Sequence, residues 1–213
     1  MVTLPQPLPF YLVSKLNHSN EPIIKHPMQT KITWTGILYH CIEHCLLTKT
    51  AAGHEITSSI TGTHENKNYQ VDYSIGTNQH WELEWMDLQT VIDNSPNSVT
   101  VERKDGRLLL NGKPSEDFQA IYDVDISLTP FTNTLPVNRL RLNDGDQRVI
   151  DVLYFDILEK QIKPVMQVYT RISAEHYIYE NYDKSFKADI TIDQQGLVTD
   201  YPGLFAMTDK SVL

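Results

Sequence analysis

The sequence predicts a mainly β protein built from one long antiparallel sheet, and three observations support this. Apolar and polar residues alternate with a period of two over several segments. Short turn signals rich in Gly, Asn and Asp separate these segments. One further segment is apolar on both strand faces, so a second layer must cover it. The 213 residues, 40% of them hydrophobic, suffice for a single domain of this class.

The N-terminal segment, residues 1–28, is rich in Pro and Asn and has poor periodicity. We therefore expect an extended arm there, followed by one β domain over residues 29–213. The first residues lack a basic region, and three prolines interrupt their short apolar run. This pattern predicts no signal peptide, so we expect a cytoplasmic protein.

Alternation is clearest in "YQVDYSI" (69–75), "WELEW" (81–85) and "FKADITI" (186–192). Each places its hydrophobic residues on one face, as expected for strands with one solvated side. With this spacing we expect roughly nine to thirteen strands. Hairpin turns are predicted at "KDGR" (104–107), "NG" (111–112), "NDGDQ" (143–147) and "QQG" (194–196).

The segment "VIDVLYFDIL" (149–158) is hydrophobic at successive positions and so on both faces of a strand. A strand covered on both sides indicates a sheet that is rolled around something, such as an internal helix.

Charge and motifs exclude several functions. The net charge of −9 argues against binding to nucleic acid or to an anionic membrane surface. No apolar run reaches the ~18 residues of a membrane span. The chain has no P-loop, G-x-G-x-x-G, H-E-x-x-H or G-x-S-x-G motif, and we expect no cofactor.

The segment "HCIEHC" (40–45) contains residue types that bind zinc. Its flanks predict a strand, on which Cys41 and Cys45 share one face while His40 and His44 share the other. The two cysteines would then lie ~13 Å apart, too far for a common ion or a disulfide. We therefore expect no metal site here.

The segment "DVDISLTPFTNTLPVNRLRL" (123–142) fits neither a plain strand nor a plain helix. We expect a strand to about Ser127, a helical turn capped by Thr129 from Pro130, and a strand resuming near Val137. Pro136 should stop the helical turn or begin a new one.

Two arginines, Arg139 and Arg141, follow this turn, and their guanidinium groups are expected to meet Asp123 or Asp125 and pin the bend. The segment then serves either as an architectural connector or as a polar rim for a ligand, and the residues alone favour neither. The two aspartates could also do acid–base chemistry, although a solvated strand face is the simpler interpretation. His176, among tyrosines, is more simply a structural residue.

The same segment, with "WTGILYHC" (34–41), "MQVYT" (166–170), "YIYENYD" (177–183) and "ITIDQQGLVTDYPGLF" (190–205), resembles the putative glycolipid-binding family. The resemblance runs from about residue 30 to 207. It implies a spiral β-roll, a long antiparallel sheet wrapped around one short helix near residues 129–140. It also implies dimers and a shape like that of LolA-type lipoprotein carriers.

One departure from the family concerns its two adjacent arginines, where this chain has Asn138 and then Arg139. If both arginines contact an anionic head group, half of that contact is lost here.

The leading hypothesis is a non-enzymatic protein that binds a glycolipid or another lipid-like molecule. The candidate ligand-binding residues are Asp123, Asp125, Thr132, Asn133, Arg139 and Tyr169. One alternative is a hydrolase of a sugar or lipid substrate that uses Asp123 or Asp125 with His176 or a tyrosine. The other is a dimeric interaction module whose interior is packed solid, without the ~300 Å³ cavity that a ligand needs.

Overall fold

A computed structural model describes residues 13–16, 22–24, 27–114 and 121–213. Most of the expected N-terminal arm lies outside these described residues. In the described part of the arm, β1 (Val13–Leu16) pairs with β2 (Pro22–Ile24) in an antiparallel manner.

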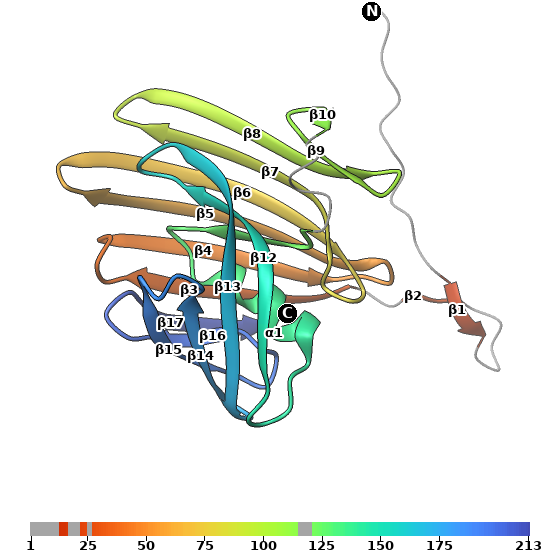
Figure 1. The fold of residues 1–213 in the computed structure, drawn as a ribbon. Helices are drawn as coiled ribbons and strands as arrows, with labels where there is room; N and C mark the ends of the chain where they lie inside the picture. Colours follow the sequence, from red (N-terminus) through yellow and green to blue (C-terminus); the bar gives the residue numbers. More distant parts are fainter. Residues whose placement is uncertain (1–12, 17–21, 25–26, 115–120) are drawn as a thin grey trace, which may run out of the picture.

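The remaining strands form one 15-stranded sheet with the order β10-β9-β8-β7-β6-β5-β4-β3-β17-β16-β15-β14-β13-β12-β11. The sheet does not close, and it rolls up so that β12 and β13 run across β4–β6 (Figure 1). Its strands are β3 (Met28–Gly36), β4 (Cys41–Lys49), β5 (Gly53–His64), β6 (Lys67–Asn78), β7 (Leu83–Ile92), β8 (Ser95–Lys104), β9 (Arg107–Leu110), β10 (Lys113–Pro114), β11 (Asp123–Ile126), β12 (Gln147–Asp156), β13 (Gln161–Ser173), β14 (His176–Asn181), β15 (Lys187–Ile192), β16 (Val198–Tyr201) and β17 (Phe205–Val212).

The predicted mainly β class is therefore confirmed, and so is the sheet wrapped around one short helix. On β6, Tyr69, Val71, Tyr73 and Ile75 are buried, while the residues between them are more exposed. The described ranges contain more strands than expected because several are only two to four residues long.

Three of the four predicted hairpin turns are confirmed: residues 104–107 join β8 to β9, residues 111–112 join β9 to β10, and residues 194–196 lie between β15 and β16. The hairpin predicted at 143–147 is wrong, because this segment follows a helix that ends at Leu140 and leads into β12. Asp105 and Gly106 have φ of 49° and 74°, and Asn111 and Gly112 have φ of 50° and 72°. Positive φ at both central residues defines the type I′ turn, whose twist matches that of the flanking strands.

The helical segment consists of η2 (Phe131–Asn133) followed directly by α1 (Thr134–Leu140). Thr129 stabilises its start, because its Oγ1 accepts a hydrogen bond of 3.0 Å from the backbone N–H of Phe131. The predicted strand from Val137 is wrong, since the helix continues to Leu140. Pro136 sits in the first turn of α1, where its missing N–H breaks no helical hydrogen bond.

The two halves of the rolled sheet enclose this helical segment. On one side, the Phe131 ring lies 6.3 Å from the Trp34 ring of β3, edge to face. On the other side, the hydroxyl of Tyr169 on β13 donates a 2.8 Å hydrogen bond to Oδ1 of Asn133. Tertiary packing of this kind stabilises a helix that would be too short to form alone.

One strand pair departs from the antiparallel expectation, because β11 and β12 are parallel. A parallel pair requires a crossover, and the helical segment lies within it. The expected double-sided burial of 149–158 holds in the middle of β12, where Val152 and Leu153 are both buried, but Val149 is 49% exposed.

Candidate functional site

A cleft of about 680 Å³ opens beside the helical segment. Strands β11–β13 supply one side of it, while β14, β16 and the turn between β3 and β4 supply the other. Its volume lies in the range of small-molecule sites.

Aromatic rings form one wall of the cleft. The Tyr39 ring lies 5.8 Å from that of Phe205, and the Phe205 ring lies 6.2 Å from that of Tyr201. The row continues from Tyr201 to Tyr179 at 6.4 Å and from Tyr179 to Phe186 at 5.9 Å. Such a wall offers apolar ring faces together with hydroxyl groups that can hydrogen bond.

The floor of the cleft carries the carboxylate of Asp125. Its Oδ1 accepts a 3.0 Å hydrogen bond from Oγ1 of Thr132, and its Oδ2 accepts one of 2.7 Å from Nε2 of Gln167. Burial raises the pKa of Asp125, and these two hydrogen bonds oppose that effect. No Lys, Arg or His in the described ranges forms an ion pair with it.

A second hydrogen-bonded group extends this floor. The hydroxyl of Tyr169 donates to Asn133 and lies 3.4 Å from Oε1 of Gln167. Burial is the largest cause that raises the pKa of Tyr169, so its hydroxyl stays protonated at neutral pH. The network fixes the amides of Asn133 and Gln167 beside the Asp125 carboxylate.

The other carboxylate of β11 has a different role. Nε of Arg139 donates to both Oδ1 and Oδ2 of Asp123 at 3.1 Å, and Nη2 completes the ion pair. The expected Asp–Arg contact is thus confirmed for Arg139. Arg141 follows the helix with φ of 47° and does not enter a strand, which corrects the expected alternation there.

The six candidate residues therefore take different places. Asp125 and Asn133 line the cleft, and Thr132 and Tyr169 are buried beside them and hydrogen bonded to them. Asp123 and Arg139 pair with each other and are not among the lining residues. Their role in binding stays a prediction.

Sequence reasoning missed most of the wall and one residue of the floor, namely Tyr39, Tyr179, Tyr201, Phe205 and Gln167. The one available signal was the alternation of tyrosines in "YIYENYD" (177–183), which places Tyr177 and Tyr179 on one strand face.

Asn138, the departure from the family pattern, faces away from the cleft. Its Nδ2 donates to the carbonyl oxygens of Thr134 and Gln195 at 3.0 and 3.1 Å. A side chain at Gly196, which has φ of 73°, would collide with this amide. Asn138 therefore joins α1 to the turn between β15 and β16.

A buried carboxylate, Glu43 of β4, joins the sheet to the start of the helical segment. Its Oε1 accepts hydrogen bonds from Ser58 (2.7 Å), Tyr73 (2.6 Å) and Thr129 (2.9 Å). Its Oε2 has no partner among the described residues. Burial raises the pKa of Glu43 to about 7, although the three hydrogen bonds lower it.

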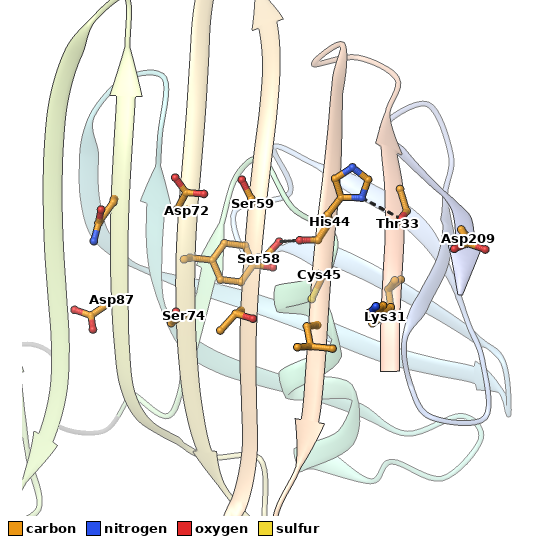
Figure 2. A pocket seen from close by; sticks show the side chains of 15 residues that line it. Lys31, Thr33, His44, Cys45, Ser58, Ser59, Asp72, Ser74, Asp87 and Asp209 are labelled. Carbon is orange, nitrogen blue, oxygen red and sulfur yellow. Dashed lines mark hydrogen bonds between the residues drawn. The ribbon is translucent and has the colours of Figure 1, made fainter. Parts of the chain in front are cut away.

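A second hollow, of about 610 Å³, lies on the outer face of the sheet. Figure 2 shows small polar and charged side chains there, including the row Thr33, His44, Ser59 and Asp72 across β3–β6. A hydrogen bond of 3.3 Å joins Oγ1 of Thr33 to Nδ1 of His44. This hollow lacks an aromatic wall, so we favour the cleft as the functional site.

The segment "HCIEHC" is a strand from Cys41, as expected, and both cysteines face the core. Across the ranges that the structure describes, no cluster of three or more His, Cys, Asp or Glu could hold a metal ion. His176, on β14, contacts Asp189 of β15 at 2.7 Å and does not line the cleft.

No helix in the described part of the chain is long and apolar enough to cross a membrane.

Fold and cleft together define a rolled-sheet protein with an aromatic cleft of ligand size. A family model described as "Putative glycolipid-binding" matches residues 31–207, so the chain belongs to this family. The predicted family membership is confirmed.

The solved structures that match the chain include the following two. A DUF1089 family protein from Pseudomonas aeruginosa has 33% sequence identity and a TM-score of 0.69, covering 77% of this chain and 91% of that one. A β-barrel-like protein of DUF1849 from Brucella abortus has 8% identity and a TM-score of 0.47, covering 88% and 98%. Among proteins with curated descriptions, none matches the chain.

Proposed function

We propose that this protein binds an uncharged glycolipid and holds its sugar in the cleft. The observation that carries the proposal is the Asp125 carboxylate, which faces an aromatic wall and has no cationic partner in the described ranges. A carboxylate flanked by fixed amides accepts hydrogen bonds from sugar hydroxyls, while the rings pack against the apolar face of the sugar. The family description supports the same class of ligand.

The charge of the cleft favours a neutral ligand. Asp125, Asp156 and Asp183 line it, against the single cation Lys163. An anionic head group would meet this excess of negative charge. The one arginine left from the family pattern, Arg139, is engaged by Asp123.

The cleft also supports this proposal over the two alternatives. An interaction module with a solid interior has no cavity of ~300 Å³, whereas this cleft has a volume of about 680 Å³.

The hydrolase alternative needs catalytic residues in the cleft, but Asp123 is paired with Arg139 and His176 lies outside the lining. The cleft tyrosines have raised pKa values, with burial as the largest cause, and are poor bases at neutral pH. Binding without turnover is the function that fits best. The dimer and the cytoplasmic location stay predictions.

Calorimetric titration with octyl glucoside below its micelle concentration tests the proposal. Asp125→Asn should weaken binding roughly 10- to 100-fold, the usual loss for a hydrogen bond to a charged group. Asp72→Asn, on the outer face of β6, is the matched control and should bind like the natural protein. Equal affinity of Asp125→Asn, or equal affinity for a lipid-like probe without sugar, would contradict the proposal.

A further inference from the structure

The mouth of the cleft is bordered by exposed apolar side chains, which we call the lips. One lip is Ile37 and Leu38, in the turn between β3 and β4, and these residues are 49% and 48% exposed. The other lip is Met166, Tyr182 and Phe186, at 45%, 52% and 37% exposure. Leu38 and the three residues of the second lip line the cleft itself.

Backbone hydrogen bonds hold both lips in place. The N–H of Ile37 donates to the carbonyl of Leu204 at 2.7 Å. The N–H of Tyr182 donates to the carbonyl of Met166 at 3.0 Å, and the N–H of Asn181 donates to that of Phe186 at 2.9 Å. The apolar side chains are thus presented to solvent on hydrogen-bonded backbone segments.

Val91, Val149 and Ile172 are also exposed, but they lie on β7, β12 and β13 at positions that do not line the cleft. Single exposed apolar residues are normal on a protein surface. A group of exposed apolar residues around one opening is unusual and marks an interaction surface.

We infer that the lips dock on an uncharged lipid bilayer, so that a glycolipid passes from the membrane into the cleft. This inference rests on the proposed function. We favour a membrane as the partner, because the exposed apolar side chains border the opening through which a lipid would enter the cleft. Apolar tips that enter the interfacial region would bring the mouth of the cleft to the lipid head groups.

The charges around the lips select the kind of membrane. Lys184 and Lys187, beside the second lip, both pair with Glu180 at 3.4 and 3.6 Å. Asp183, which lies between Tyr182 and Lys184 in the sequence, lines the cleft. Lys163 also lines the cleft, together with Asp156 and Asp183, so the basic residues described near the lips are matched by acidic ones. The attraction to anionic lipids is therefore small, and docking depends on the apolar side chains.

Co-sedimentation with vesicles tests the inference, using Ile37→Asp, which changes a lip residue outside the cleft lining. With vesicles of phosphatidylcholine containing a monoglucosyl diacylglycerol, this variant should bind about tenfold more weakly than the natural protein. Ile172→Asp, a substitution of the same kind at a residue of β13 that is 44% exposed, should bind normally. Both variants should keep their affinity for soluble octyl glucoside, which shows that the fold and the cleft are intact.

Three outcomes would overturn docking: natural protein that does not sediment with uncharged vesicles, binding that requires anionic lipid, or equal losses in Ile37→Asp and Ile172→Asp. If light scattering shows that Ile37→Asp dissociates a dimer while vesicle binding is unchanged, the lips contact a second copy instead. If the natural protein does not bind octyl glucoside, the proposed function itself is wrong, whatever the result with vesicles.

Discussion

Asp123 and Arg139 form a bidentate ion pair between β11 and α1, with Nε of Arg139 at 3.1 Å from both carboxylate oxygens. Asp125, two residues further along β11, has only neutral partners, Thr132 and Gln167. One carboxylate therefore anchors the helical segment, and the other remains available to a ligand.

Arg139→Met should strongly destabilise the protein, because it leaves the 1%-exposed Asp123 side chain charged and unpaired. Breaking a buried pair in this way costs about 3–5 kcal/mol, which urea denaturation would measure. Lys184→Met removes an exposed partner of Glu180 and should change stability little. If the two variants unfold at the same urea concentration, the anchoring role of the pair is wrong.

Glu43 should make stability depend on pH. Its pKa is near 4.5 in the unfolded chain and about 7 in the folded one, so the folded state binds more protons between these values. The free energy of unfolding should therefore fall as pH rises from 4.5 to 7, by on the order of 3 kcal/mol, and level off above.

Glu43→Gln should remove this decline, since its amide oxygen still accepts the three hydrogen bonds but does not titrate. Denaturation of the natural protein and the variant between pH 5 and 8 gives the difference directly. Glu55→Gln, at an exposed position of β5, serves as the control and should leave the profile unchanged. If the free energies of unfolding of the natural protein and Glu43→Gln change with pH in parallel, Glu43 does not cause the decline.

Tyr69→Phe should loosen the first lip and the aromatic wall. The Tyr69 hydroxyl donates a 2.7 Å hydrogen bond to the carbonyl of Tyr39, whose ring packs against Phe205 in the cleft. We expect a loss of about 1 kcal/mol in unfolding free energy and weaker binding of octyl glucoside. Tyr122→Phe, at a residue that is 40% exposed, should affect neither. Unchanged binding by Tyr69→Phe would show that this bond does not shape the cleft.

Much of the sheet was predictable because its signals are local. Alternation in "YQVDYSI" and turn dipeptides such as Asp105–Gly106 follow directly from strand geometry and positive φ. The course of the chain beyond Val137 was not predictable in this way. Alternating Leu and Arg residues suit a strand, but packing between the two halves of the sheet keeps residues 134–140 helical.

The candidate site was predictable only in part, for the same reason. Asp125 and Asn133 lie in one unusual segment that attracts notice in the sequence. Tyr39, Tyr201 and Phe205 come from distant parts of the chain and meet only because β17 pairs with both β3 and β16. No pattern within one segment records such a long-range pairing.

A crystal structure with a bound alkyl glucoside is the sharpest test of whether the cleft holds a sugar. We expect the sugar ring to lie against Tyr179 and Tyr201, with one of its hydroxyl groups within hydrogen-bond distance of Asp125. A glucoside bound in the outer hollow over His44 and Asp72, or a cleft that holds only the alkyl chain, would contradict it.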